Sequence, residues 1–359
     1  MKKNIFQITE NISLESGGLR TMISLLDKNI NATSAYCSKI LTLKKEPSDL
    51  FQALKSQSNP WCYTTEFVSN LHKNVNKEDI VHSHGVWMHP QYAANKFSKK
   101  HHIKSVLTSH GMLQPYLLND KGFKKKIYLD CVLKKILDTT SVLHAITDDE
   151  KNNLSKLTKN RNIEVIPNLI NMNIESPAAY NAEEEYILYL GRFHRVKGLE
   201  LLLKAFSQIK NKYIKLKLAG FSNQYFLDIM KMYQNENIIK RIEFVGEKNG
   251  MEKDLLYANA KVFVSPSYSE VIGMVNLEAA MQKTPVITTF NTGLDKNWSK
   301  NGGILINPAV EELTIALDDA TSWDNIERID RGSKLFNFVY QQYSWDKKGF
   351  LWQELYDNI

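Results

Sequence analysis

The stretch Ser265-Pro-Ser-Tyr-Ser-Glu270-Val-Ile-Gly-Met-Val-Asn-Leu-Glu278-Ala-Ala-Met281 comes directly after the apolar run Lys261-Val-Phe-Val264. An apolar run, a short polar segment and a second apolar segment, in this order, predict a buried strand, a loop and a helix. The helix is expected to begin near Gly273. Glu270 would then lie at the mouth of the helix, and Glu278 would lie about two turns inside it.

The mouth of this helix has the properties of a binding site for anions and hydroxyl groups. The first N–H groups of a helix have no partner inside it, and the helix dipole places its positive end there. The amides concerned belong to Val271, Ile272, Gly273 and Met274. A carboxylate accepts two hydroxyl donors at once, so Glu270 and Glu278 suit a polyhydroxylated ligand that carries a diphosphate. The alternative is that both are solvated glutamates that interact only with the helix dipole.

Apolar runs of strand length alternate with helical patterns along the chain, which predicts an α/β fold. In the first half we expect strands at residues 4–8, 33–37, 62–67, 80–83, 105–108, 142–146 and 164–166, and helices at residues 18–28, 91–100, 123–137 and 148–157. In the second half we expect strands at residues 186–190, 215–219, 242–245, 262–264, 286–288 and 304–306, and helices at residues 199–209, 224–233, 274–282 and 311–320. Two successive series of this kind imply two doubly wound parallel sheets.

The two series are separated by residues 167–185, which are rich in Asn, Pro and acidic residues. This composition, without hydrophobic periodicity, is typical of a linker. Sheets of this kind bind ligands at the carboxyl ends of their strands.

The composition is that of an ordinary globular protein with room for two domains, with 359 residues of which 43% are hydrophobic. No apolar run approaches the roughly 20 residues that a membrane span needs. The net charge of +7 comes mainly from Lys, which suits diffuse attraction to phosphates or anionic lipid. A protein that reads nucleic-acid bases would rely more on Arg. The three cysteines have no metal or redox spacing and are interpreted as reduced thiols of a cytosolic protein.

The segment around Glu270 and Glu278 resembles the Glu-x7-Glu signature of the retaining family 4 glycosyltransferases, and the run Pro285-Val-Ile-Thr-Thr289 strengthens the resemblance. In that family the first Glu contacts the donor sugar and the second binds the ribose of the nucleotide. The resemblance implies the GT-B fold, two Rossmann-like domains that face a central cleft. It implies an acceptor domain at residues 1–170, a nucleotide-sugar donor domain at residues 171–343, and a C-terminal helix at residues 344–359 that crosses back to the first domain.

The loop Gly191-Arg192-Phe-His-Arg-Val-Lys197-Gly198 is a second part of the resemblance. Its glycines permit a tight turn near a ligand, while Arg192 and Lys197 supply positive charge. The loop is similar to the Gly-Arg…Lys-Gly loop of the family, where Arg and Lys hold the donor pyrophosphate and stabilise the leaving group. A basic surface turn is the alternative.

Two positions in the first half also match the family. Gly17 and Gly18 follow the first expected strand, and a glycine pair lets the backbone approach a phosphate or a sugar. In the family this loop closes over the donor phosphate and the acceptor. His110, in Ser109-His110-Gly111, follows the strand expected at residues 105–108. The family has a matching His-Gly near the donor sugar and the departing bond.

His82 and His84 share one face of an expected strand because strand side chains alternate. A zinc site would need further ligands at metal spacing, and the sequence offers no acidic or Cys partner for them. One of the two, or Trp87, could instead line the acceptor cleft.

The stretch from Lys121 to Lys135 predicts a basic amphipathic helix. It could engage an anionic membrane surface or a lipid-linked acceptor. The alternative is a helix packed on the core with a solvated Lys face.

At two places the sequence departs from the family pattern, and these departures leave the identity of the donor sugar nucleotide open. The usual Glu-Gly-Phe-Gly is Glu270-Val271-Ile272-Gly273 here, and the usual Gly-Gly loop after Pro285 is replaced by residues 291–298. The bulkier Val271 is expected to reshape the sugar pocket.

Taken with the resemblance, the sequence is interpreted as a metal-independent retaining glycosyltransferase that uses a nucleotide-diphosphate sugar, with UDP-sugar favoured over GDP-sugar. The acceptor would be a saccharide, lipid-linked, in bacterial O-antigen, capsule or exopolysaccharide synthesis at the cytoplasmic face of the cell membrane. Catalytic roles are expected for His110, Glu270, Arg192 and Lys197, with no cofactor, no metal and no nucleic-acid partner. The other hypotheses are a nucleotide-sugar 2-epimerase on the same fold and a non-catalytic partner subunit that binds a sugar nucleotide.

Overall fold

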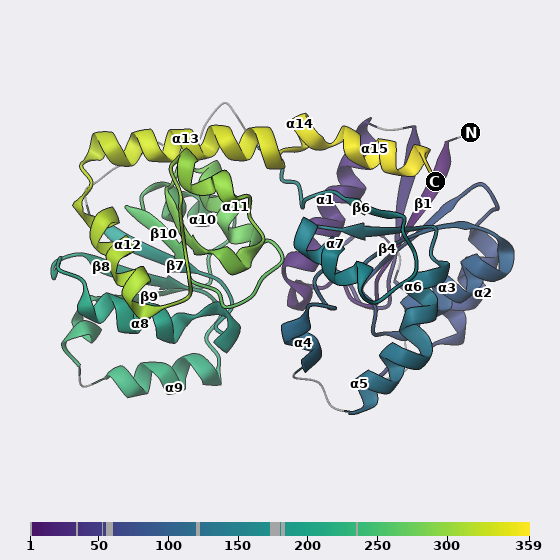
Figure 1. Cartoon of the computed structure of the whole chain (residues 1–359), viewed down its shortest axis with the longest axis horizontal. Helices are drawn as coiled ribbons and strands as arrows, with labels where there is room; N and C mark the ends of the chain where they lie inside the picture. Colours follow the sequence, from purple (N-terminus) through teal and green to yellow (C-terminus); the bar gives the residue numbers. More distant parts are fainter. Residues whose placement is uncertain are drawn as a thin grey trace. The chain divides into compact units, whose positions relative to one another are not determined.

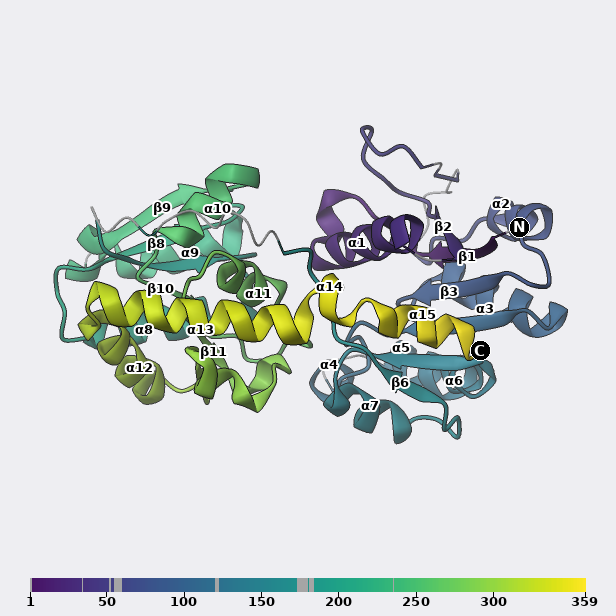
Figure 2. The same cartoon turned by 90° about the horizontal axis from the view of Figure 1, so that it is seen from above.

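The chain folds into two compact units, each built around one parallel sheet (Figures 1 and 2). The computed structural model describes residues 2–33, 35–51, 53–54, 60–119, 123–172, 180, 184–234 and 236–359. The first unit comprises Met1–Leu169 and Lys348–Ile359, and the second comprises Ile170–Lys347.

The sheet of the first unit has six parallel strands in the order β2-β1-β3-β4-β5-β6. The strands are β1 (Lys3–Ile8), β2 (Tyr36–Leu41), β3 (Ile80–His84), β4 (Lys104–Thr108), β5 (Val142–Ala145) and β6 (Ile163–Val165). The helices are α1 (Gly18–Thr33), α2 (Thr65–Asn74), α3 (His89–His101), α4 (Pro115–Asn119), α5 (Phe123–Tyr128), the π-helical turn η2 (Leu129–Leu133), α6 (Lys134–Thr139), α7 (Asp148–Ser155) and α15 (Phe350–Asp357), with the short η1 (Leu14–Ser16) before α1.

Both faces of this sheet are covered, as a parallel sheet requires. Val81 packs on one face in a core cluster with Phe67 of α2 and Phe97 of α3. The neighbouring His82 points to the other face and meets α15, where its Nδ1 lies 2.8 Å from the hydroxyl of Tyr356. Residues 348–359 therefore belong to the first unit although the second unit precedes them in the chain.

The sheet of the second unit also has six parallel strands, in the order β12-β11-β10-β7-β8-β9. The strands are β7 (Tyr186–Leu190), β8 (Lys215–Ala219), β9 (Ile242–Gly246), β10 (Val262–Ser265), β11 (Val286–Thr289) and β12 (Ile304–Ile306). The helices are α8 (Leu199–Gln208), α9 (Gln224–Tyr233), α10 (Gly250–Ala258), α11 (Met274–Met281), α12 (Val310–Ser322), α13 (Asn325–Tyr343) and α14 (Trp345–Lys348), with short 3-10 turns η3 (Arg195–Lys197), η4 (Asn237–Arg241), η5 (Phe290–Thr292) and η6 (Lys296–Asn301).

The chain order of the strands reverses once in each sheet, between β1 and β3 in the first and between β7 and β10 in the second. In doubly wound sheets ligands bind beside such a reversal, at the carboxyl ends of the strands. The loops after β7 and β10 hold the two motifs on which the sequence interpretation depends. The predicted α/β class with two doubly wound parallel sheets is therefore confirmed.

Two expected strands are wrong or displaced. Residues 62–67 were expected to form a strand, but α2 begins at Thr65 because the hydroxyl of Thr64 caps it by accepting the N–H of Glu66, 3.3 Å away. The strand expected at residues 33–37 begins only at Tyr36, since α1 continues to Thr33. The sequence interpretation also missed α13, a 19-residue helix capped by the Asp324 carboxylate.

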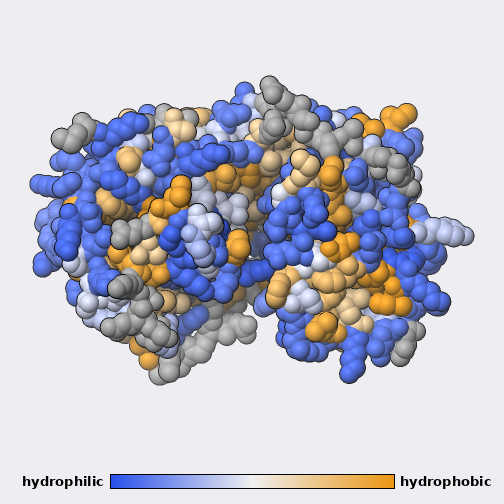
Figure 3. All heavy atoms as spheres, turned by 180° about the vertical axis from the view of Figure 1, so that it is seen from behind, coloured by the Kyte–Doolittle hydropathy of each residue, from blue (hydrophilic) through white to orange (hydrophobic). Residues whose placement is uncertain are grey.

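No helix among the described residues is both long enough and apolar enough to cross a membrane. The face of the molecule in Figure 3 is mostly hydrophilic, with hydrophobic side chains in small groups between the polar ones. The basic stretch that begins at Lys121 is described from residue 123 onward, so Lys121 itself lies outside the described residues.

Candidate functional site

The mouth of α11 is formed as the sequence predicts, with Gly273 as the N-cap residue and Met274 as the first helical residue. The Glu270 carboxylate lies beside it, where Oε1 accepts the Ser267 hydroxyl at 2.6 Å and pairs with the Lys197 ammonium at 2.8 Å. Among the described residues no partner occupies the backbone N–H groups of residues 271–273. A carboxylate, a cation and unused amides therefore meet at one helix end.

The loop after β7 and the loop after β10 are in close contact. Gly198 has a φ of +72°, and a Cβ at this position would lie 2.1 Å from the carbonyl oxygen of Pro266. The N–H of Tyr268 donates to the carbonyl of Val196 at 2.8 Å. Only glycine fits at residue 198, and this close approach is what brings Lys197 to Glu270.

Arg192 lies in the same loop as Lys197 and is held through its backbone. Its carbonyl accepts the Tyr189 hydroxyl at 3.3 Å, while its side chain is exposed and has no ion pair with any residue that the structure describes. The guanidinium is therefore available to an anion that approaches the end of β7.

Glu278 lies on the second turn of α11 and has its own partners on α10. Its Oε2 lies 3.3 Å from the Lys253 ammonium and accepts the Tyr257 hydroxyl at 3.2 Å. Tyr257 is fully buried, and burial together with the Glu278 carboxylate raises its pKa well above the usual value. The sequence interpretation placed Glu278 but did not identify Lys253 or Tyr257, because α10 was not predicted.

His110 stands at the end of β4 in the first unit, in the left-handed backbone region at a φ of +50°. The turn is held by the buried carboxylate of Glu150, which accepts the Ser109 hydroxyl at 2.5 Å, the Gly111 N–H at 2.6 Å and the Ile146 N–H at 2.8 Å. The sequence interpretation missed Glu150. Its signal was the spacing Thr147-x-x-Glu150 directly after a strand, which is typical of a helix cap.

The His110 ring lies against His84, with its Nε2 3.0 Å from Nδ1 of His84. Both nitrogens of His82 and of His84 are hydrogen-bonded to protein atoms. Among the described residues no group of three or more His, Cys, Asp or Glu side chains is arranged to hold a metal ion. The Trp87 ring lies elsewhere, under the Lys125 ammonium at 5.1 Å and against Tyr128.

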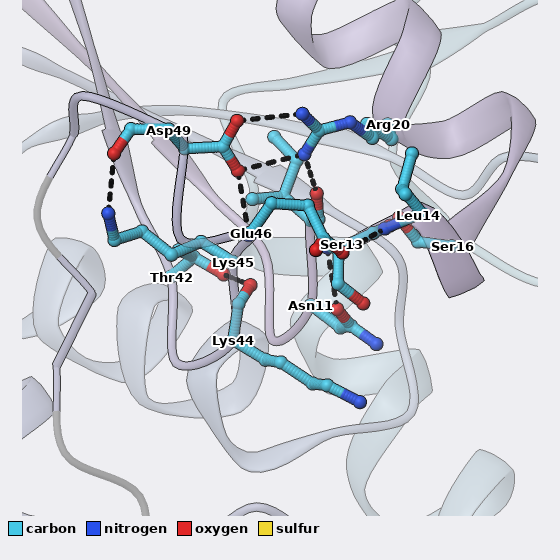
Figure 4. Close-up of polar contacts among 11 residues, drawn as sticks. Asn11, Ser13, Leu14, Ser16, Arg20, Thr42, Lys44, Lys45, Glu46 and Asp49 are labelled. Atoms are coloured by element: carbon cyan, nitrogen blue, oxygen red, sulfur yellow. Dashed lines mark hydrogen bonds and ion pairs between the residues drawn. The ribbon is translucent and has the colours of Figure 1, made fainter.

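Gly17 directly precedes α1 and Gly18 begins it, and a side chain at either position would meet nothing within 4 Å. Gly17 has a φ of +56° and follows η1. The loop before it is pinned by Arg20, which donates to the Asp49 carboxylate at 2.7 and 2.9 Å and to the carbonyl of Ile12 (Figure 4). This pairing lowers the pKa of Asp49 and raises that of Arg20.

The second anchor of the same loop is Glu46, whose carboxylate accepts the Leu14 N–H at 2.7 Å. The glycine pair therefore has free space beside its backbone, and the loop that carries it is held by hydrogen bonds of Arg20 and Glu46. No hydrogen bond joins this loop to His110 within the described part of the chain.

The described part of the basic stretch, α5 with η2 and α6, packs one side on the core. Leu133, Ile136 and Leu137 are buried, while Lys125 and Lys126 are exposed. The Lys134 ammonium pairs with Asp130 at 2.7 Å.

The chain is similar to known glycosyltransferases. The family described as "Glycosyltransferase Family 4" matches residues 43–173, and the family described as "Glycosyl transferases group 1" matches residues 173–328. The chain belongs to the family 4 glycosyltransferases.

Two curated relatives differ in how much of them the chain spans. The O-antigen chain mannosyltransferase RfbU of Salmonella typhimurium is 23% identical over 90% of this chain and 95% of its own length. The uncharacterized glycosyltransferase MJ1607 of Methanocaldococcus jannaschii is 33% identical, but the match covers 46% of this chain and 42% of the relative.

The solved structures agree on the GT-B fold. Sucrose-phosphate synthase from Thermosynechococcus elongatus superposes with a TM-score of 0.81 at 21% identity over 99% of this chain and 98% of the other. Anabaena Alr3699/HepE, solved in complex with UDP-glucose, gives 0.80 at 15% identity over 99% and 100%. WaaG, a glycosyltransferase involved in lipopolysaccharide biosynthesis, gives 0.74 at 15% identity over 99% of each chain.

Three buried histidines and the half-buried His110 make the stability of the protein depend on pH. Burial lowers the pKa of His82 and His84 well below the usual value, that of His110 to about 3 and that of His144 to about 4. In the unfolded chain the same side chains take up protons near pH 6.5. The unfolded state therefore binds more protons than the folded state between these pH values, and stability falls as the pH falls.

We expect the free energy of unfolding, measured by urea titration, to decrease between pH 7 and pH 5. The slope should approach about 1.4 kcal/mol per pH unit for each histidine that stays neutral in the folded protein. The paired carboxylates with lowered pKa, such as Asp49, titrate below this window. A free energy of unfolding that is constant from pH 7 to pH 5 would contradict the buried, neutral state of these rings.

Removing the Glu150 carboxylate should destabilise the first unit. In Glu150→Ala three buried donors lose their acceptor, which should lower the free energy of unfolding by about 3 kcal/mol or more. Glu164→Ala, which removes an exposed carboxylate from the same unit, is the matched control and should change it by less than about 0.5 kcal/mol. Equal effects of the two substitutions would show that Glu150 does not hold the His110 turn.

Proposed function

We propose that this protein is a retaining, metal-independent glycosyltransferase that transfers a sugar from a nucleotide-diphosphate sugar to a saccharide acceptor. The observation that carries the proposal is the meeting of Lys197, Glu270 and the unused amides of residues 271–273 at the mouth of α11. This combination binds hydroxyl groups and phosphate oxygens side by side.

Each group at this helix end has a role in the proposal. Glu270 and the amides of Ile272 to Met274 hold the sugar hydroxyls, and Glu278 holds the ribose. Arg192 and Lys197 stabilise the diphosphate as it leaves, which is electrostatic catalysis by fixed charges. Because Lys197 already pairs with Glu270, a bound diphosphate would share its ammonium with the carboxylate.

No side chain is proposed as a nucleophile. By resemblance to the family, the acceptor hydroxyl attacks on the face from which the diphosphate leaves, and the leaving phosphate helps to take its proton. The proposal also assigns His110 a contact with the transferred sugar, and it assigns Gly17 and Gly18 a backbone approach to the donor phosphate.

The relatives support the choice of substrates. HepE was solved with UDP and with UDP-glucose, which favours a UDP-sugar donor here. RfbU is named for the O-antigen chain and WaaG for lipopolysaccharide biosynthesis, which favours a surface-polysaccharide acceptor that is lipid-linked. An enzyme of this kind would work at the cytoplasmic face of the cell membrane.

A thermal-shift screen against UDP, GDP, ADP and their sugar derivatives, without metal and with EDTA, tests the donor site. A ligand that binds only the folded state raises the melting temperature, so a shift with one nucleotide identifies the base. No shift at millimolar concentrations would contradict the proposal and favour a non-catalytic subunit. A product that forms without any acceptor would favour the 2-epimerase.

Loss of the Glu270 carboxylate should impair transfer while the fold is kept. We expect Glu270→Ala to lower kcat/KM for the donor by about 100-fold, the size of effect typical for a group that acts on the transition state. Glu252→Ala is the control, because Glu252 has an exposed ion pair with Lys248 in the same unit. Full transfer activity of Glu270→Ala would refute the site.

The basic helix offers a separate test of membrane attachment. We expect the protein to co-sediment with vesicles of anionic lipid at low salt, and we expect added salt to weaken binding because screening reduces such attraction. The double variant Lys125→Glu, Lys126→Glu should bind less, since both side chains are exposed. No binding at low salt would rule out this attachment.

A further inference from the structure

A continuous series of hydrogen bonds crosses the interior of the first unit and ends at His110. It starts at the carbonyl of Ile166 and passes through His144, Thr108, His82, Tyr356, Gln7 and His84. Except for His110, every side chain in the series is buried. Because each neutral imidazole has one N–H and one bare nitrogen, the series can be assigned one proton at a time.

The first proton is set by the backbone. The carbonyl of Ile166 can only accept, so Nε2 of His144, 2.8 Å away, must carry the hydrogen. Nδ1 of neutral His144 is then bare and accepts the Thr108 hydroxyl at 2.8 Å. Thr108 has only one hydroxyl proton, and the hydrogen bond to His144 uses it.

Thr108 also lies against His82. Its oxygen must accept from Nε2–H of His82 at 2.8 Å, which leaves Nδ1 of His82 to accept the Tyr356 hydroxyl at 2.8 Å. The side-chain amide of Gln7, whose nitrogen lies 3.3 Å from the Ser38 hydroxyl, is also placed as a donor to the Tyr356 oxygen, an interaction that acts to lower the pKa of that hydroxyl. The amide nitrogen of Gln7 therefore faces Tyr356, and its carbonyl oxygen faces the opposite way.

The last two hydrogen bonds of the series join Gln7 to His84 and His84 to His110. The Gln7 Oε1 atom accepts Nε2–H of His84 at 2.7 Å, so Nδ1 of His84 is bare. That nitrogen, 3.0 Å from Nε2 of His110, accepts the His110 Nε2–H. The remaining ring nitrogen of His110, Nδ1, is unprotonated and has no partner among the residues that the structure describes.

We infer that this series of hydrogen bonds fixes the tautomer of His110, so that the ring offers an unprotonated Nδ1 as a hydrogen-bond acceptor to the ligand. Gln7, His84 and Thr108 are positioning residues, because they act on the ligand only through His110. The inference that the ligand group is a hydroxyl of the transferred sugar rests on the proposed function.

The fixed tautomer limits what His110 can do. A bare nitrogen accepts from a hydroxyl, but it offers nothing to a phosphate oxygen, which is itself an acceptor. Neutral His110 therefore selects a hydroxyl and does not act as a proton donor to the leaving diphosphate. Stabilisation of that charge is left to Arg192 and Lys197.

Nitrogen NMR of the whole chain labelled with 15N-histidine tests the tautomer directly, since protonated and bare ring nitrogens resonate far apart. The His110 signals are assigned by their loss in His110→Asn. At pH 7 we expect one neutral form with the proton on Nε2. A proton on Nδ1, or a charged ring, would overturn the inference, and neither result depends on a substrate.

Thr108→Val cuts the series at a residue that does not touch His110. The N–H of His82 then has no acceptor, and a buried donor without a partner is costly. His82 can avoid this cost by moving its proton to Nδ1, which reverses the series through Tyr356, Gln7 and His84. We expect the His110 proton to appear partly or wholly on Nδ1 in Thr108→Val.

Two controls accompany this variant. Thr108→Ser keeps the hydroxyl and should keep the wild-type tautomer. Ser38→Ala removes the other contact of the Gln7 amide, at 3.3 Å, and should also leave His110 unchanged. If Thr108→Val folds and keeps the His110 proton on Nε2 alone, the series does not fix the tautomer and the inference fails.

Transfer kinetics separate this inference from the proposed function. A lost hydrogen bond to the sugar should lower kcat/KM for the donor about tenfold in Thr108→Val, with recovery in Thr108→Ser. If the NMR result holds and no nucleotide sugar binds, the proposed function fails while the tautomer stands. If transfer occurs and Thr108→Val changes the tautomer without changing kcat/KM, His110 does not contact the reacting sugar.

Discussion

Parallel pairing is the constraint on which both units depend. All twelve strands that the structure describes pair in parallel, so each successive strand must be reached by a crossover, and the strand ends of one direction emerge at one edge of the sheet. Because the chain order reverses between β7 and β10, their loops lie next to each other although some 75 residues separate them in sequence. Gly198 then allows the two loops to touch, and the Lys197–Glu270 pair follows from that contact.

The sequence was most informative where apolar runs were unambiguous. The start of α11 and the placement of Glu270 could be predicted because the apolar run at residues 262–264, a polar loop and a helix follow one another without competing signals. The segment at residues 62–67 misled because its aromatic and β-branched residues suit a strand, whereas the cap at Thr64 and the buried Phe67 and Leu71 belong to a helix. The cap and the burial of these two side chains together outweighed the local preference.

The partners of buried polar groups could not be predicted in the same way. Glu150 and Gln7 are polar residues that a pattern assigns to the surface, yet both are buried. Their burial depends on donors and acceptors that arrive from distant parts of the chain, such as Tyr356 for Gln7. Inside a protein such groups are stable only when every hydrogen bond is made, so the network tolerates few alternatives.

The helix that completes this network, α15, comes after the second unit in the chain. Tyr356 and Trp352, which cover His82 and His144, belong to α15, and the whole second unit is translated before them. During synthesis the first sheet therefore leaves the ribosome with two polar rings open to water on one face. Domains generally fold as units during synthesis, with the amino-terminal one first. Here the first unit can reach its final packing only after the second has been made, so the His110 site is completed last.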